Sequence, residues 1–315
     1  MSSDASTPGG RAGAAGRDLP LPLEAFERYR DPAGPRTLVL DLSGVAVELS
    51  GLPETLAEAM IARYGPFLGA GDGTGRPLRV MVRSAPLDYF IPPPPADAAE
   101  YYRAPTAYDG SIFRLTTYRL AAWFDVRNRE GQVLLGAGGF DPAPRAMENF
   151  LRSAVAWLAI DRGGLFLHGA GIVRRGRCYL FYGPTGAGKS TLAALSREGD
   201  VISDDLSLLL REPGGLVAAG SPFRGTYTGG GPVTGRFPVA GFYRLRKDQQ
   251  TAVRPGDAGC FADLLGNLPW VVDQLPRFPD LIDQVHRTVE GSRFAYLHFR
   301  MDEDFWPAID RAERG

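Results

Sequence analysis

Nine consecutive residues combine glycines with a lysine and three hydroxyl side chains. They are Gly183, Pro184, Thr185, Gly186, Ala187, Gly188, Lys189, Ser190 and Thr191, and they match the pattern G-x-x-x-x-G-K-[ST]. Glycines at these spacings let backbone N–H groups turn inward around an anion, where side chains would obstruct it. The motif predicts a site for ATP and Mg²⁺, with Lys189 on the β- and γ-phosphates and Ser190 on the metal. A glycine-rich turn with an exposed lysine is the alternative.

Lysine is rare in this chain. Only two of its 35 basic residues are lysines, Lys189 and Lys247, and the others are arginines. Wherever a generic positive charge would serve, the chain uses arginine. A retained lysine is therefore a candidate for a site that needs a compact ammonium group in place of a planar guanidinium group.

Two adjacent carboxylates, Asp204 and Asp205, follow a short apolar segment, residues 200–202, soon after the glycine-rich motif. In an open α/β sheet the carboxyl end of such a strand faces the nucleotide. One carboxylate could hold Mg²⁺ and the other could take the proton of an attacking hydroxyl. Asp is also common in helix caps and solvated turns. The preceding motif favours the functional interpretation.

His168 lies on the segment before the one that leads into the glycine-rich motif. A lone histidine among apolar residues is more often a structural residue than a functional one. The residues alone therefore favour a structural role.

The elements that must position these side chains are predicted from hydrophobic periodicity. In the second half we expect strands over residues 165–173, 178–182, 200–202, 206–210 and 239–245. A helix over 189–195 follows the glycine-rich motif, and helical patterns continue from residue 245 to the C-terminus. An earlier helix presents one apolar face, made of Met147, Phe150, Leu151, Ala154, Val155 and Leu158.

The first half reads as a mixed α/β region. We expect a strand or hairpin over 37–49, a helix over 54–64, a strand over 78–82 and antiparallel strands over 111–126 and 132–135. The predicted organisation is a disordered tail (1–19), a mixed α/β N-terminal domain (20–145) and a P-loop domain (146–315).

Composition limits the classes of function. The chain has 315 residues, 44% hydrophobic and 23% charged, with a formal net charge of −1, which is typical of a soluble globular protein. The near-zero net charge argues against a nucleic-acid partner or an anionic membrane surface. The sequence shows neither a membrane span nor a signal peptide, so we expect the cytoplasm as its location. Whether the chain forms a homo-oligomer is left open.

The spacing of these motifs resembles the catalytic domain of HPr kinase/phosphorylase, whose fold is shared with phosphoenolpyruvate carboxykinases. The resemblance covers residues 165–210, from Leu167-His168-Gly169 through the glycine-rich motif to Ser203-Asp204-Asp205. It implies an HPr-kinase/PEP-carboxykinase-like P-loop domain. It also implies that Asp204 is the acid/base residue, Asp205 the metal-side carboxylate and His168 a supporting active-site residue.

The resemblance continues loosely to residue 245. The family's Glu-Ile-Arg-Gly segment reads Pro222-Phe223-Arg224-Gly225 here, which implies that Arg224 neutralises transferring charge, while the glutamate is absent. The first half does not resemble the N-terminal domain of HPr kinases, and no HPr-docking region follows the core. These differences predict an acceptor other than HPr.

The sequence thus predicts an ATP- and Mg²⁺-dependent kinase that phosphorylates a hydroxyl, with serine of a peptide or small protein as the favoured acceptor. Acceptor choice is assigned to the N-terminal half and to the glycine-rich loop 226–235, which is either a mobile cover or a plain connection between strands. Two alternatives stay open. One is a nucleotide-binding regulatory module with little or no catalysis, and the other is a small-molecule kinase.

Overall fold

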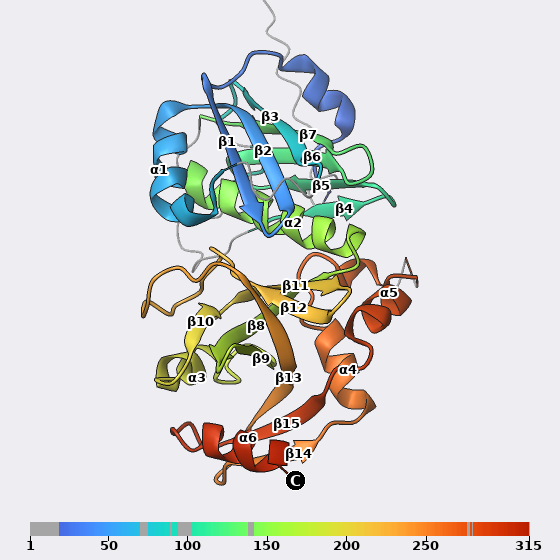
Figure 1. Ribbon diagram of the computed structural model, residues 1–315. Helices are drawn as coiled ribbons and strands as arrows, with labels where there is room; N and C mark the ends of the chain where they lie inside the picture. Colours follow the sequence, from blue (N-terminus) through green and yellow to red (C-terminus); the bar gives the residue numbers. More distant parts are fainter. Residues whose placement is uncertain are drawn as a thin grey trace, which may run out of the picture.

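The computed structural model describes residues 19–69, 75–88, 90–93, 103–137, 142–275, 278 and 280–314. Two mixed β-sheets lie one above the other, with helices between and around them (Figure 1). This arrangement confirms the expected mixed α/β class. Of the predicted tail only Leu19 is described, and its side chain is exposed. Within these ranges no helix combines the length and the apolar composition that crossing a membrane requires.

The first sheet is built by the N-terminal half. Its strands, in spatial order, are β1 (Arg36–Leu42), β2 (Val45–Leu52), β3 (Leu78–Ser84), β7 (Glu130–Leu135), β6 (Leu120–Asp125), β5 (Ile112–Thr116) and β4 (Thr106–Tyr108). β3 pairs in parallel with β2 and with β7, and the other pairs are antiparallel. The hairpin predicted over 37–49 is confirmed. Its two turn residues, Ser43 and Gly44, both have positive φ, as a tight hairpin turn requires.

The strand predicted over 111–126 is two strands, β5 and β6. A turn at residues 117–119 separates them, because the Thr117 hydroxyl accepts a hydrogen bond from the backbone N–H of Leu120 at 3.0 Å. A side-chain oxygen that bonds backbone three residues ahead competes with the ladder. The predicted antiparallel pairing around residues 127–131 is confirmed by β6 and β7.

The second sheet carries the glycine-rich motif. Its strands are β8 (Leu165–Arg174), β9 (Arg177–Tyr182), β10 (Asp200–Ser203), β11 (Leu206–Glu212), β12 (Gly215–Ala219), β13 (Arg236–Lys247), β14 (Ala252–Pro255) and β15 (Phe294–Phe299). The main path runs β10-β8-β11-β12-β13-β15-β14, and β9 pairs with both β13 and β8. β9, β13 and β15 run parallel to one another.

The C-terminal region differs from the helical patterns predicted after residue 245. It contains α4 (Ala258–Leu265), α5 (Asp280–Val289) and α6 (Phe305–Arg314), but β14 and β15 lie among them. β15 is six residues long and is almost entirely buried. Periodicity cannot distinguish such a short apolar segment from a buried helix segment. Its strand state is fixed by parallel pairing with β13, about 50 residues earlier.

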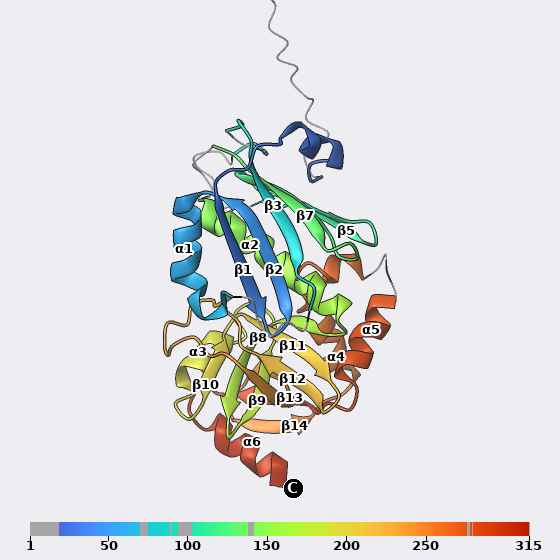
Figure 2. The same cartoon turned by 45° about the horizontal axis from the view of Figure 1, so that its top comes forward.

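Helix α2 (Ala143–Asp161) joins the two halves. It contacts β2 and β6 of the first sheet and β8 and β11 of the second, and it crosses behind β1 and β2 in Figure 2. The predicted apolar face is buried, and so are Trp157 and Ile160 outside it. A helix that is apolar on more than one side is buried on more than one side. One hydrophobic core therefore continues from the first sheet through α2 into the second.

Two more helices position the cavity described below. α1 (Glu54–Tyr64), as predicted over 54–64, packs on β1 and on α2. α3 (Lys189–Leu195) follows the glycine-rich motif, as predicted, and packs on β8. A second hydrophobic core fills the space between the second sheet, α3 and α6. Phe181, Leu192 and Trp306 are among its buried residues.

Candidate functional site

The glycine-rich motif leaves β9 at Tyr182 and turns directly into α3. Gly183, Gly186 and Gly188 all have positive φ, a backbone state that side chains disfavour. Space is also short at Gly183, where a Cβ atom would lie 2.9 Å from the guanidinium group of Arg244. The loop therefore needs glycine for its conformation at three positions, and a side chain at Gly183 would also displace the Arg244 guanidinium group. Such a loop can present backbone N–H groups to an anion.

Lys189 begins α3, and its side chain folds back over the loop. Its Nζ donates hydrogen bonds to the carbonyl oxygens of Gly183 at 2.8 Å and Pro184 at 3.4 Å. The residue is only 8% exposed. Burial lowers the pKa of its ammonium group, Asp205 raises it and Arg244 lowers it. The ammonium group is held at the loop, where an anion could replace the two carbonyl contacts.

The two carboxylates follow the last residue of β10, Ser203. The Ser203 hydroxyl donates to the carbonyl oxygen of Phe223 at 2.9 Å and accepts from the N–H groups of Asp205 and Leu206. This buried hydroxyl fixes the turn that carries both aspartates. β10 pairs antiparallel with β8, which pairs antiparallel with β9, so β10 and β9 end at the same edge of the sheet. That geometry places the acidic pair beside the glycine-rich loop.

The two aspartates have different surroundings although they are adjacent. Asp204 is 2% exposed, and its two carboxylate oxygens accept from the N–H groups of Gly225 at 2.7 Å and Tyr227 at 2.9 Å. Asp205 instead faces a guanidinium group and an imidazole. Nη1 of Arg152 lies 3.0 Å from its Oδ2, and Nε2 of His168 lies 3.3 Å from its Oδ1. Asp204 thus anchors a loop, and Asp205 belongs to a charge cluster.

His168 lies on β8 and faces the cavity instead of the core, with 38% of its side chain exposed. Burial lowers the pKa of its imidazole, Lys189 lowers it, Asp205 raises it and Arg152 lowers it further. The sequence alone favoured a structural role for His168, but in the structure its side chain lines the cavity beside Asp205.

Arg224, to which the resemblance assigns the neutralisation of transferring charge, contacts its own loop in this structure. Its guanidinium group donates to the carbonyl oxygens of Gly230 at 3.2 Å, Gly229 at 3.4 Å and Gly231. Arg224 is not among the described residues that line the cavity. A ring of glycine carbonyls is a good acceptor for a guanidinium fork. In this structure Arg224 therefore holds the loop 226–235.

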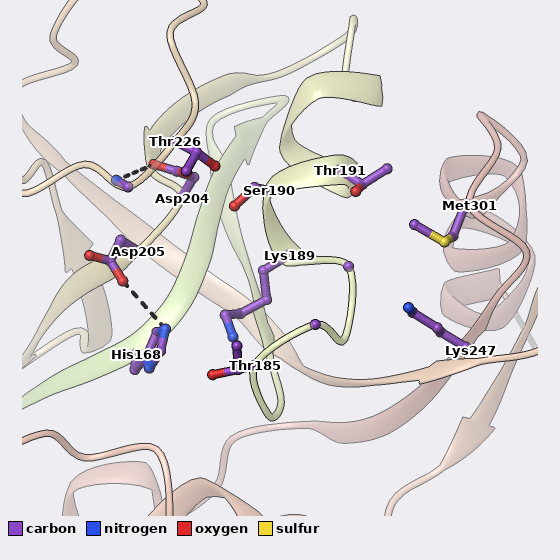
Figure 3. A pocket seen from close by; sticks show the side chains of 13 residues that line it. His168, Thr185, Lys189, Ser190, Thr191, Asp204, Asp205, Thr226, Lys247 and Met301 are labelled. Atoms are coloured by element: carbon purple, nitrogen blue, oxygen red, sulfur yellow. Dashed lines mark hydrogen bonds and ion pairs between the residues drawn. The ribbon is translucent and has the colours of Figure 1, made fainter. Parts of the chain in front are cut away.

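These elements enclose a cavity of about 450 Å³ (Figure 3). His168, Lys189, Ser190, Thr191, Asp204 and Asp205 line it, together with glycine-rich loop residues 185, 186 and 188. Of the predicted nucleotide-binding residues, Gly183, Pro184 and Ala187 support the loop without lining the cavity. The volume lies in the range of small-molecule sites in proteins.

No protein-family model and no curated protein matches this chain. The chemistry of the site is therefore argued from the side chains around the cavity and from the strands that bring them together. The side chains comprise two ammonium groups, an imidazole, two carboxylates, a thioether and several hydroxyls around a glycine-rich loop.

The donor set fits Mg²⁺ only in the presence of phosphate. Within the described part of the chain, no three His, Cys, Asp or Glu side chains form a group that could hold a metal ion. Mg²⁺ is usually bound by one or two carboxylates with substrate phosphates and water supplying the other oxygens. The Ser190 hydroxyl and the two aspartates could supply such a partial set.

Five residues at or beside the cavity are missing from the sequence-based site, and two of them, Gly225 and Thr226, follow Arg224 directly. Lys247 and Met301 line the cavity directly, and Arg152 reaches it through Asp205. Lysine rarity was a signal for Lys247, since both lysines of the chain line this one cavity. No local sequence motif around Met301 or Arg152 predicts that they belong to the site, because packing between distant segments brings each of them there.

Proposed function

We propose that this chain is an ATP- and Mg²⁺-dependent kinase with an HPr-kinase/PEP-carboxykinase-like P-loop domain. Its acceptor is a hydroxyl, namely serine on a peptide or small protein other than HPr. The single observation that supports it best is the shared cavity of Lys189, Ser190, Asp204 and Asp205. An anion-binding loop beside two carboxylates is the set of groups that phosphoryl transfer needs.

In this proposal the loop and Lys189 bind the phosphate chain, and Ser190 with Asp205 holds the metal. Mg-ATP supplies the phosphoryl group, and its metal neutralises charge on the phosphate oxygens. Asp204 takes the proton of the acceptor hydroxyl as the bond from that oxygen to the γ-phosphorus forms. The bond from the γ-phosphorus to the bridging oxygen breaks, and ADP leaves with the electron pair. The adjacent aspartates are close enough to exchange these two roles.

A regulatory nucleotide-binding module is the second candidate, and one observation favours it. Both oxygens of Asp204 accept backbone hydrogen bonds, and the two oxygens of Asp205 face the Arg152 guanidinium group and the His168 imidazole. Carboxylate oxygens that are engaged in this way have fewer lone pairs available for the proton of an incoming hydroxyl. Catalysis then requires Asp204 to release a backbone N–H when the acceptor binds.

Transfer of labelled γ-phosphate into a lysate of the native organism tests the proposal. We expect one or a few labelled polypeptides with phosphoserine, no efficient labelling of HPr, and no labelling with the Lys189→Ala variant. Mg-ATP binding without transfer to any polypeptide or metabolite would favour the regulatory module. Label in a metabolite alone would favour a small-molecule kinase.

A further inference from the structure

Lys247 and Met301 lie on the opposite side of the glycine-rich loop from the acidic pair. Figure 3 shows Asp204, Asp205 and His168 on one side of α3 and the loop, and Lys247 and Met301 on the other. Lys247 is the last residue of β13, and Met301 comes two residues after the end of β15. Because β9, β13 and β15 run parallel, the glycine-rich loop, Lys247 and Met301 emerge at one edge of the sheet.

We call the side of the cavity formed by Lys247 and Met301 the second wall, and the glycine-rich loop packs toward it. A Cβ atom at Gly188 would lie 3.6 Å from the ring of Phe299 and 3.9 Å from the terminal methyl carbon of Met301. Met301 adopts a positive φ of 69°, which is uncommon for a residue with a side chain. It is 40% exposed, so a large apolar side chain is presented at the cavity instead of being buried. Of the five non-glycine residues with positive φ in the described part of the chain, Met301 is the one that lines the cavity.

The position of the acidic pair gives the bound donor a direction. The transferring phosphate must lie next to the group that takes the hydroxyl proton, and Asp204 and Asp205 are the carboxylates of this cavity. The loop holds the phosphate chain between the acidic pair and the second wall. The nucleoside end of the donor must then extend toward Lys247 and Met301.

We propose that Lys247 and Met301 bind the nucleoside of the triphosphate donor, an assignment that rests on the proposed kinase function. A thioether packs favourably against an aromatic ring, so Met301 covers one face of the base. The Lys247 ammonium group carries three donors and no acceptor, which suits ribose oxygens and ring nitrogens of the base. A compact ammonium on a thin stem enters such a cavity, whereas the guanidinium group used elsewhere in this chain is broader.

A truncated ligand separates the nucleoside from the phosphates. Binding of Mg-ATP and of Mg-tripolyphosphate, which has no nucleoside, is measured by calorimetry on the full chain. We expect Lys247→Ala and Met301→Ala each to weaken Mg-ATP binding by about three- to tenfold, the scale of one hydrogen bond or one sulfur–aromatic contact. Neither variant changes the affinity for tripolyphosphate. Lys189→Ala weakens the binding of both ligands.

Two matched controls are available. Met301→Leu keeps an apolar side chain of similar volume and retains most of the affinity for Mg-ATP. Arg246→Gln removes one positive charge from the neighbouring position of β13. In the wild type the Arg246 guanidinium group stacks 3.9 Å from the ring centroid of Tyr296. Because side chains alternate faces along a strand, Arg246 and Lys247 point to opposite faces of the sheet. Arg246→Gln therefore leaves the affinity for both ligands unchanged.

Several outcomes would overturn the assignment. If Lys247→Ala weakened the binding of Mg-ATP and of tripolyphosphate equally, Lys247 would be a phosphate ligand. If neither variant changed the affinity for Mg-ATP, the nucleoside would bind elsewhere. Wild-type protein that binds tripolyphosphate as tightly as ATP would remove the nucleoside site while sparing the phosphate site. Wild-type protein that binds neither ligand would refute the proposed function itself.

Discussion

Nη1 of Arg152 lies 3.0 Å from Oδ2 of Asp205, so the helix between the two sheets holds one of the two carboxylates of the cavity. The contact extends further. Nη2 of Arg152 lies 2.6 Å from Oε1 of Glu148, one helical turn earlier, and Nε of Arg63 lies 2.6 Å from Oε2 of the same glutamate. Ion pairs thus connect α1, on the first sheet, to the cavity on the second.

The Arg152→Met variant removes the cation beside Asp205 while keeping a long apolar side chain. Hydrogen bonds between charged groups contribute about 1.5–3 kcal/mol, so we expect turnover to fall by about ten- to a hundredfold. The KM for ATP changes less, because the glycine-rich loop and Lys189 are untouched. Steady-state kinetics with thermal unfolding as a check on folding measures both effects.

Glu148→Gln is the matched control for Arg152. It removes the charge that joins Arg63 to Arg152 but leaves the contact between Arg152 and Asp205 in place. We expect a lower stability with a much smaller loss of turnover. Full turnover in Arg152→Met would show that this ion pair serves the packing of α2 alone.

Asp204→Asn tests the proposed proton acceptor, and the structure adds a second expected effect. The asparagine oxygen can accept from only one of the two N–H groups, and its amide group faces the other. We expect the free energy of unfolding to fall by about 1–3 kcal/mol. Phosphate transfer falls by about a hundredfold or more, the scale for loss of a general base. Denaturant titration and single-turnover transfer assays measure the two quantities.

Ser203→Ala separates these two effects of Asp204. Its hydroxyl fixes the same turn, so its loss destabilises the turn without removing a carboxylate. If Ser203→Ala lowers transfer as much as Asp204→Asn at a similar loss of stability, Asp204 is an anchor of loop 225–227 and not a base.

Stability should depend on pH through His168. Burial first, and then Lys189, lower the pKa of its imidazole below the ordinary value of 6.5. As the pH falls through about 6.5, the unfolded chain therefore binds a proton more readily than the folded chain. The contribution of His168 to the free energy of unfolding decreases in this window and levels off below the folded pKa.

The His168→Gln variant isolates that contribution, since the other two histidines stay in place. We expect the wild type to lose more stability than the variant between pH 7.5 and pH 5.5 in denaturant titrations. A larger loss in the variant would mean that Asp205 raises the pKa of His168 more than burial lowers it.

Arg224→Ala distinguishes the two roles considered for this residue. If Arg224 holds the loop 226–235, the variant becomes more sensitive to cleavage by chymotrypsin after Tyr227, while its affinity for Mg-ATP stays within about twofold. A large loss of turnover with unchanged protease sensitivity would instead assign Arg224 to the transferring phosphate, as the resemblance implies.

Much of the local structure was predictable. The bounds of α1 and α3 agree with the helices predicted over 54–64 and 189–195. These predictions succeed because they depend on consecutive residues, namely the apolar spacing within each helix and the flanking glycines Gly65 and Gly188. β4, β12, β14 and β15 and the split between β5 and β6 were missed. Short strands and side-chain turns depend on distant pairing or on a single hydroxyl group, which periodicity does not detect.

The sequence by itself determined the glycine-rich loop, its lysine and hydroxyl, and the acidic pair after a short strand, because each is a run of neighbouring residues. Only the tertiary structure decided which distant groups face them. Parallel pairing of β9, β13 and β15 brings Lys247 and Met301 to the loop, and packing of α2 between two sheets brings Arg152 to Asp205. The Arg224 guanidinium group donates hydrogen bonds to carbonyl oxygens of its own loop. Such contacts arise when burial of apolar surface joins segments far apart in the chain, and no local pattern records them.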